Sequence, residues 1–201
     1  MASTAPLQHE AGIVRHVVRH TAATARLLVL GDAGCGKTAL LRALSGAPLD
    51  RAYDMTAAPS VTSAAVAVPS SSPPARVLFV CVDCPGGSVF NMRPGGDVAR
   101  GLLATAAAVA VCFDVQSRDS LAAAARWLRL VPPGLPGVLV GCKADLRSAD
   151  RAEVGEGEAG GAAGALGLKF FEASAATGEG VRAPFEWLAG EVAAGAAGRQ
   201  Q

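Results

Sequence analysis

The stretch Gly31-Asp32-Ala33-Gly34-Cys35-Gly36-Lys37-Thr38 matches the pattern G-x-x-x-x-G-K-[ST]. A short apolar run, residues 27–30, precedes it, and a helix-favouring segment, residues 38–44, follows it. In this strand–loop–helix context, glycines let backbone N–H groups converge on phosphate oxygens, and the helix N-terminus adds positive partial charge. The stretch therefore predicts a phosphate-binding loop within an α/β domain.

Apolar runs and helix-favouring segments alternate along the rest of the chain. We expect strands at 27–30, 61–68, 76–82, 107–113, 138–140 and 169–171, and helices at 38–44, 120–130, 153–166 and 182–194. Ser117 is the expected N-cap of the second helix, and segments 61–68 and 76–82 flank a turn and predict a hairpin. This alternation indicates an α/β fold with a mostly parallel six-stranded sheet covered by helices on both faces.

The composition limits the possible functions. Of the 201 residues, 51% are hydrophobic and 17% charged, and the net charge is +1, which argues against a nucleic-acid partner. No apolar run reaches the roughly 18 residues needed to cross a bilayer. The first residues lack the features of a signal peptide, Ala2 excludes N-myristoylation, and the last residues include no cysteine for prenylation. We therefore expect a cytoplasmic protein with no direct lipid anchor.

The chain has five cysteines, an odd number, and four of them lie in or beside apolar runs. This pattern predicts free thiols packed as small hydrophobic side chains in a reducing compartment. Cys81 and Cys84 form a C-x-x-C pair, for which zinc or redox chemistry is the alternative. That alternative is disfavoured because there is no second pair and the three histidines lie far away, at positions 9, 16 and 20.

Further motifs follow the phosphate loop in a recognisable order. They are Tyr53-Asp54-Met55-Thr56, Asp83-Cys84-Pro85-Gly86, residues 113–121 with Trp127-Leu128 behind them, Lys143-Ala144-Asp145, and Glu172-Ala173-Ser174-Ala175. From about Arg26 to Leu188 the chain thus resembles the Ras superfamily of small GTPases, and Rab proteins most closely. The resemblance implies a single P-loop G domain at 25–190, between a flexible N-terminal arm at 1–24 and a C-terminal tail at 191–201.

The resemblance also implies GTP or GDP with Mg²⁺ as cofactors. Loop residues Asp32, Ala33, Gly34, Cys35, Gly36, Lys37 and Thr38 are expected to hold the phosphates, with Lys37 reaching the β- and γ-phosphates. Thr38 and Thr56 are expected to bind Mg²⁺ directly and Asp83 through water. The amide of Gly86 is expected to contact the γ-phosphate, so Lys37, Thr56 and Gly86 are the candidate catalytic residues for GTP hydrolysis.

The base is expected to lie against Cys142, Lys143, Asp145, Ser174 and Ala175. The resemblance implies that Asp145 accepts both guanine N–H donors and that the Ala175 amide contacts the base oxygen.

Four positions depart from the family pattern, and one of them is Pro85, which replaces a small flexible residue before Gly86. Cys142 stands where the family has Asn, and Leu49 stands where an aromatic residue usually covers the base. Each loss costs about 1–3 kcal/mol, so affinity for the nucleotide falls by about one to four powers of ten if both losses are real. Gly87 replaces a glutamine that orients the attacking water. We therefore expect very slow GTP hydrolysis.

A narrower resemblance rests on three short signals. The Tyr-x-Met-Thr sequence at 53–56, Ala183-Pro184-Phe185, and the absence of a prenylated cysteine are similar to intraflagellar transport protein 27. This implies a place in the ciliary or flagellar transport-B complex, paired with an intraflagellar transport protein 25-like subunit. Two alternatives stay open: a Rab-type vesicle-trafficking GTPase, and a degenerate G-domain scaffold that binds little nucleotide.

Overall fold

The computed structural model describes residues 21–48, 56–69, 71–86, 97–149 and 153–198. They form a six-stranded sheet with the strand order β2-β3-β1-β4-β5-β6. The strands are β1 (Thr21–Leu30), β2 (Ser60–Ala67), β3 (Arg76–Asp83), β4 (Ala108–Asp114), β5 (Gly137–Cys142) and β6 (Lys169–Ala173). Only β2 runs antiparallel to its neighbour in this sheet. The predicted mostly parallel sheet and its hairpin are therefore confirmed.

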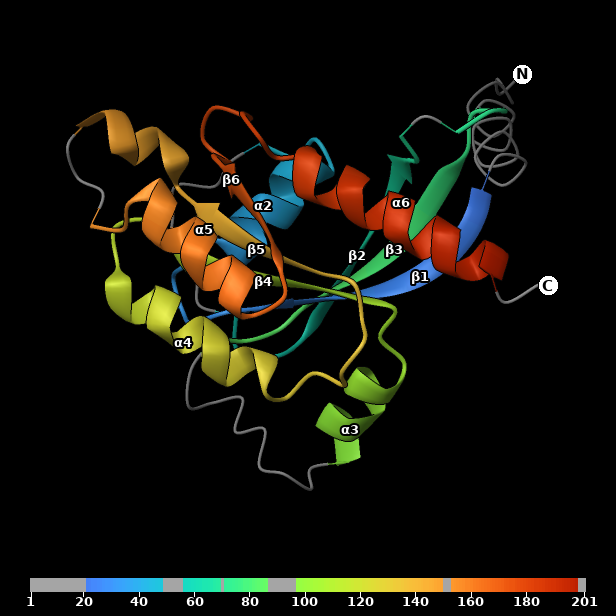
Figure 1. Ribbon diagram of the computed structural model, residues 1–201, viewed down its shortest axis with the longest axis horizontal. Helices are drawn as coiled ribbons and strands as arrows, with labels where there is room; N and C mark the ends of the chain where they lie inside the picture. Colours follow the sequence, from blue (N-terminus) through green and yellow to red (C-terminus); the bar gives the residue numbers. More distant parts are fainter. Residues whose placement is uncertain (1–20, 49–55, 70, 87–96, 150–152, 199–201) are drawn as a thin grey trace, which may run out of the picture.

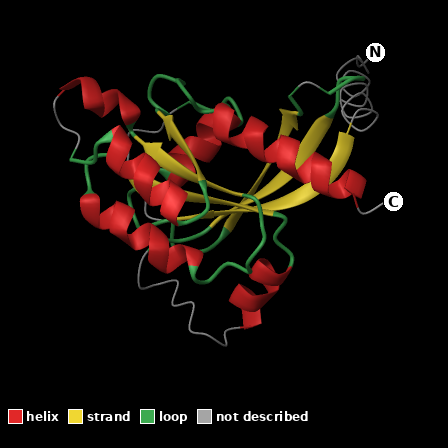
Figure 2. Ribbon diagram, in the orientation of Figure 1, coloured by secondary structure: helices red, strands yellow, loops and turns green. Residues whose placement is uncertain are grey.

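Helices cover both faces of the sheet, as Figures 1 and 2 show. The described helices are α2 (Lys37–Leu44), α3 (Asp97–Ala104), α4 (Arg118–Leu128), α5 (Glu156–Ala165), α6 (Ala183–Gly198) and the 3-10 helix η1 (Ala144–Ala149). Apolar side chains of α2 and α6 pack on one face, and those of α3, α4 and α5 pack on the other. The predicted cap of α4 is also present, because the Ser117 side chain accepts a hydrogen bond from the Ser120 amide.

Strand β1 illustrates why the central strands read as unbroken apolar runs. Leu27 and Val29 belong to the core beneath α2 and α6, whereas Leu28 and Leu30 belong to the core beneath α4 and α5. Successive side chains of a strand point to opposite faces. A parallel strand buried on both faces therefore needs apolar residues at every position.

Several boundaries differ from those expected from the sequence. Strand β1 begins at Thr21, so residues 21–24 belong to the sheet, although the sequence analysis placed them in the N-terminal arm; residues 1–20 lie outside the described part of the chain. Helix α6 continues to Gly198, and Val192, in the expected tail, is buried against the core. The sequence analysis also missed helix α3, whose eight residues follow no recognised motif. Helix α2 has the same length, but the phosphate loop before it marks its start. Within the described residues, no helix combines the length and the hydrophobicity that a membrane span requires.

Candidate functional site

The loop Gly31–Thr38 joins the carboxyl end of β1 to the start of α2. Gly31 has a φ of 141°, and a Cβ atom there would lie 2.3 Å from the carbonyl oxygen of Cys112 on β4. Gly36, the N-cap of α2, has a φ of 110°, and its Cβ would lie 2.9 Å from that of Cys142 on β5. Both positions require glycine, because the loop packs directly against the ends of two neighbouring strands.

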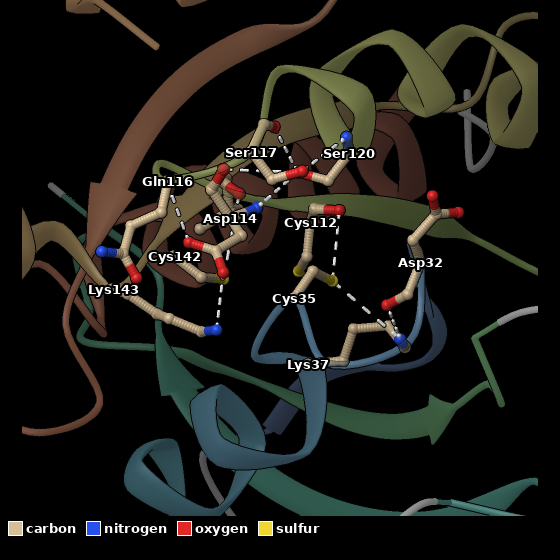
Figure 3. A network of polar contacts seen from close by, with 11 residues as sticks. Asp32, Cys35, Lys37, Cys112, Asp114, Gln116, Ser117, Ser120, Cys142 and Lys143 are labelled. Carbon is tan, nitrogen blue, oxygen red and sulfur yellow. Dashed lines mark hydrogen bonds and ion pairs between the residues drawn. The ribbon is translucent and has the colours of Figure 1, made fainter. Parts of the chain in front are cut away.

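Lys37 is held inside this loop. Its side chain is buried, and its Nζ donates a hydrogen bond to the carbonyl oxygen of Gly31 at 2.9 Å. A second hydrogen bond, to the carbonyl oxygen of Asp32 at 2.8 Å, is drawn in Figure 3. A buried ammonium needs such partners, because burying an unpaired charge is costly. The bonds fix a positive charge at the centre of the loop.

Three oxygen-bearing side chains meet next to the loop, although they come from three separate segments. The Thr38 hydroxyl donates to Oδ2 of Asp83 at 2.5 Å, and the hydroxyl oxygens of Thr38 and Thr56 are 3.0 Å apart. Burial raises the pKa of the Asp83 carboxyl, while Thr38 and Lys37 oppose that shift. Among the described residues, the buried Oδ1 of Asp83 finds no hydrogen-bond partner.

This donor set fits a magnesium ion. Mg²⁺ prefers hard oxygen ligands and keeps several of its waters. Hydroxyl and carboxylate oxygens are present, and a hydrated cation would supply the partner that Oδ1 of Asp83 lacks. The structure thus brings together Thr38, Thr56 and Asp83, the residues that the sequence analysis assigned to the metal.

Gly86 lies against the loop from the other side. A Cβ atom at this position would be 2.2 Å from the backbone nitrogen of Ala33 and 2.4 Å from the carbonyl carbon of Asp32. The backbone of Gly86 is therefore in close contact with the loop, where its expected partner, a phosphate, would be bound.

Two of the departures from the family pattern, Leu49 and Gly87, lie outside the described residues.

A pocket of about 220 Å³ opens beside the loop. It is lined by Gly36, Ala39, Leu40, Cys142, Lys143, Asp145, Leu146, Ala173, Ala175 and Ala176. The buried Ser174 donates its hydroxyl to Oδ1 of Asp145 at 2.6 Å. Every residue that the sequence analysis placed at the base therefore lies in this pocket or in direct contact with it.

Two ion pairs that the sequence analysis did not identify brace the pocket. Lys143, which has a φ of 62°, donates from Nζ to Oδ2 of Asp114 at 2.6 Å. From η1, Nε of Arg147 donates to both carboxylate oxygens of Glu172 on β6, at 2.9 and 2.8 Å. These hydrogen bonds raise the pKa of Arg147. The two loops that carry Asp145 and Ser174 are thus tied together.

Residues 26–194 match the sequence profile of the Ras family. The chain belongs to the Ras family. Relatives include the probable Ras-related protein Rab-4A of Echinococcus multilocularis, 31% identical over 78% of this chain and 67% of that protein. The intraflagellar transport protein 27 homolog of Bos taurus is 32% identical over 82% and 88%. The Ras-related protein RHN1 of Nicotiana plumbaginifolia is 33% identical over 85% and 82%.

This Ras-family chain is accordingly a Rab/Ras-like small GTPase. Ras-family proteins bind GTP or GDP with Mg²⁺ and hydrolyse GTP. The loop, the oxygen cluster and the pocket described above are arranged in the order that a nucleotide with its metal ion requires.

The cysteines of this Ras-family domain are free and buried. Burial raises the pKa of the Cys35, Cys81 and Cys84 thiols to about 12, so these thiols stay protonated and unreactive at neutral pH. In the described parts of the chain, no group of three or more His, Cys, Asp or Glu residues could hold a metal ion. The Cys81 and Cys84 side chains pack in the apolar cores on the two faces of the sheet.

Proposed function

We propose that this chain binds guanine nucleotide, hydrolyses GTP slowly, and acts as a nucleotide-loaded subunit of a ciliary intraflagellar transport complex. One observation supports nucleotide binding most strongly: the groups that would hold the base, the phosphates and the metal ion lie next to one another. One pocket has Gly36 of the phosphate loop and Asp145 in its lining, and the same loop leads to the hydroxyl groups of Thr38 and Thr56. Base, phosphates and metal ion can therefore be held by adjoining groups.

At the phosphate end, the backbone N–H groups of residues 32–38 would face the phosphate oxygens at the N-terminus of α2. Lys37 would place its charge on the β- and γ-phosphates, and Gly86 would donate its amide to the γ-phosphate. Thr38 and Thr56 would bind Mg²⁺, with Asp83 holding a metal-bound water. When bound, Mg²⁺ offsets negative charge on the phosphate oxygens.

At the base end, Asp145 would select guanine over other bases. Its carboxylate would accept the two N–H groups of guanine, and Ser174 orients it through the 2.6 Å hydrogen bond. Cys142 offers only a weak donor, and its Sγ is directed to the carbonyl oxygen of Val140 at 3.9 Å. We therefore expect guanine selectivity with a lower affinity than an Asn at position 142 would give.

Slow GTP hydrolysis is inferred from position 87, where the family has a glutamine that orients the attacking water. Gly87 has no side chain with which to orient a water molecule. The phosphate and metal groups can stabilise the charge of the transition state, but the attacking water is left without a positioning residue. The bound nucleotide would then persist long enough for the protein to act in an assembly.

The ciliary role rests on the bovine relative named as an intraflagellar transport protein 27 homolog and on the short motifs at 53–56 and 183–185. An intraflagellar transport protein 25-like subunit is the proposed direct partner. Co-expression of the two chains followed by size-exclusion chromatography tests this role, and separate elution would refute it. Two relatives named as Rab proteins, at 31% and 32% identity, favour vesicle trafficking as the second candidate. That candidate predicts nucleotide-dependent recovery with membranes instead.

The nucleotide proposal is tested by denaturing the purified protein and identifying the released nucleotide by chromatography. We expect GDP or GTP near one per chain; adenine nucleotide or an empty site refutes the proposal. The variant Asp145→Asn tests base selectivity, because it keeps the side-chain size but presents an amide donor. This variant should lose affinity for GDP and gain affinity for xanthosine diphosphate, whose 2-oxo group accepts a hydrogen bond from that donor.

Single-turnover assays with loaded GTP then test the slow rate of hydrolysis, and turnover equal to that of active Rab proteins would contradict it.

A further inference from the structure

The phosphate loop carries an acidic side chain that helix α4 holds. Oδ1 of Asp32 accepts a hydrogen bond from Nε1 of Trp127 at 2.8 Å, and Oδ2 lies 3.7 Å from a guanidinium nitrogen of Arg126. Trp127 is 8% exposed and belongs to the core beneath α4. In Figure 3 the carboxylate of Asp32 points away from Lys37, while its carbonyl oxygen accepts from the Lys37 ammonium. The backbone of Asp32 thus binds Lys37 within the phosphate loop, while its side chain binds residues of helix α4.

The direction of this side chain matters because of its charge. A carboxylate turned toward bound phosphates would repel them and would compete with them for the ammonium of Lys37. The indole N–H is a donor that is mostly shielded from water, so its hydrogen bond to a carboxylate is stronger than a neutral one. Arg126 adds less, because its side chain is 66% exposed and the pair is screened by solvent.

We propose that Trp127 is a positioning residue for the nucleotide site: it holds the Asp32 carboxylate away from the phosphates, with Arg126 as a weaker second partner. Helix α4 thereby sets the affinity of the loop for phosphate through one hydrogen bond. The inference rests on the proposed nucleotide-binding function, because it concerns the same loop.

The test measures dissociation constants for GDP and GTP, each with Mg²⁺, in the full chain. Trp127→Phe removes the indole N–H and keeps an aromatic ring. It should raise the constant for GDP about threefold to tenfold, and that for GTP more, because GTP carries an additional negative charge. Asp32→Asn in the Trp127→Phe background removes the repelling charge and should restore affinity to within about twofold of wild type.

The controls separate this role from packing. Trp187→Phe on α6, where Trp187 lies against Phe171, should leave both constants unchanged. Arg126→Glu changes an exposed side chain, and it should also weaken binding, with GTP affected more than GDP. Asp32→Asn in the Arg126→Glu background should restore part of the loss, which direct repulsion between the new carboxylate and the phosphates would not allow. This second variant decides the matter if Trp127→Phe does not fold.

The possible outcomes are distinct. If Trp127→Phe weakens GDP and GTP equally and Asp32→Asn does not rescue it, Trp127 acts only through packing and the inference is wrong. Unchanged affinity in both the Trp127→Phe and the Arg126→Glu variants also refutes it, while leaving the proposed function intact. A wild-type chain that binds neither nucleotide refutes the proposed function and this inference together.

Discussion

Replacing Gly86 with alanine should force the segment that ends in Gly86 away from the phosphate loop. The new Cβ would lie 2.2 Å from the nitrogen of Ala33, whereas ordinary van der Waals contact begins at 3.4 Å. The obstructing atoms belong to the backbone, which cannot rotate aside as a side chain can. One of the two segments must therefore retreat by about 1 Å, and overpacking of this kind typically costs about 1–3 kcal/mol.

The displacement predicts a selective loss of GTP binding. A hydrogen bond from the Gly86 amide to the γ-phosphate, lengthened by about 1 Å, leaves the range of productive geometry. Hydrogen bonds to charged groups contribute about 1.5–3 kcal/mol, so affinity for GTP should fall about tenfold to a hundredfold. GDP has no γ-phosphate and should lose much less. Isothermal titration of Gly86→Ala with GDP and with a non-hydrolysable GTP analogue, each with Mg²⁺, measures the ratio directly.

Gly101→Ala provides the matched control. Gly101 lies in helix α3, and a Cβ there would meet nothing within 4 Å. Alanine should stabilise this helix by about 0.5–1 kcal/mol and leave the GTP-to-GDP affinity ratio unchanged. If the folded Gly86→Ala variant keeps the wild-type ratio, then Gly86 does not contact the γ-phosphate, and the reasoning is refuted.

Three further predictions concern other parts of the chain. Cys142→Asn should tighten GDP binding about fivefold to a hundredfold, seen as slower release of a fluorescent GDP; unchanged or faster release would contradict a hydrogen bond from position 142 to the base. Gly164→Ala on α5, where a Cβ meets nothing within 4 Å, should raise the free energy of unfolding in urea by about 0.5–1 kcal/mol; a decrease would show that the glycine is needed. The Cys35 thiol has a pKa of about 12 in the folded chain against 9.0 ordinarily, so it stays neutral while the unfolded chain ionises. Its stabilising contribution is complete below pH 9 and is lost between pH 9 and 12, by about 1 kcal/mol at pH 10. Cys35→Ala should remove that part of the difference between urea unfolding at pH 8 and at pH 10, and an unaltered difference would contradict the assignment.

The features predicted correctly from the sequence are those set by neighbours in the chain. The loop 31–38, the hairpin of β2 and β3, and the Ser117 cap each depend on residues a few positions apart. Their geometry follows from glycine placement, alternation and a short polar side chain at a helix start. Helix α3 was missed because eight residues establish a period poorly and no motif precedes them, as the phosphate loop precedes the equally short α2. The ends of β1 and α6 were placed too far inward.

The contacts that complete the site were not predictable in the same way. The β4–β5 register places Asp114 opposite Cys142, and this brings the Asp114 carboxylate to Lys143. Trp127 donates to a carboxylate that is 95 residues away in sequence. Such partners have no fixed spacing, because strand register and helix packing decide which side chains meet.

The phosphate loop, the order of strands and helices, and membership of the Ras family were determined by the sequence alone, because local spacing and apolar patterning encode them. Tertiary structure alone decided that Thr38, Thr56 and Asp83 share one cluster and that Asp145 is held by Ser174 beside the phosphate loop. It also decided that the Asp32 carboxylate turns toward α4. The physical reason is that parallel strands carry their following loops to one edge of the sheet, where only three-dimensional packing sets which atoms come within hydrogen-bonding distance.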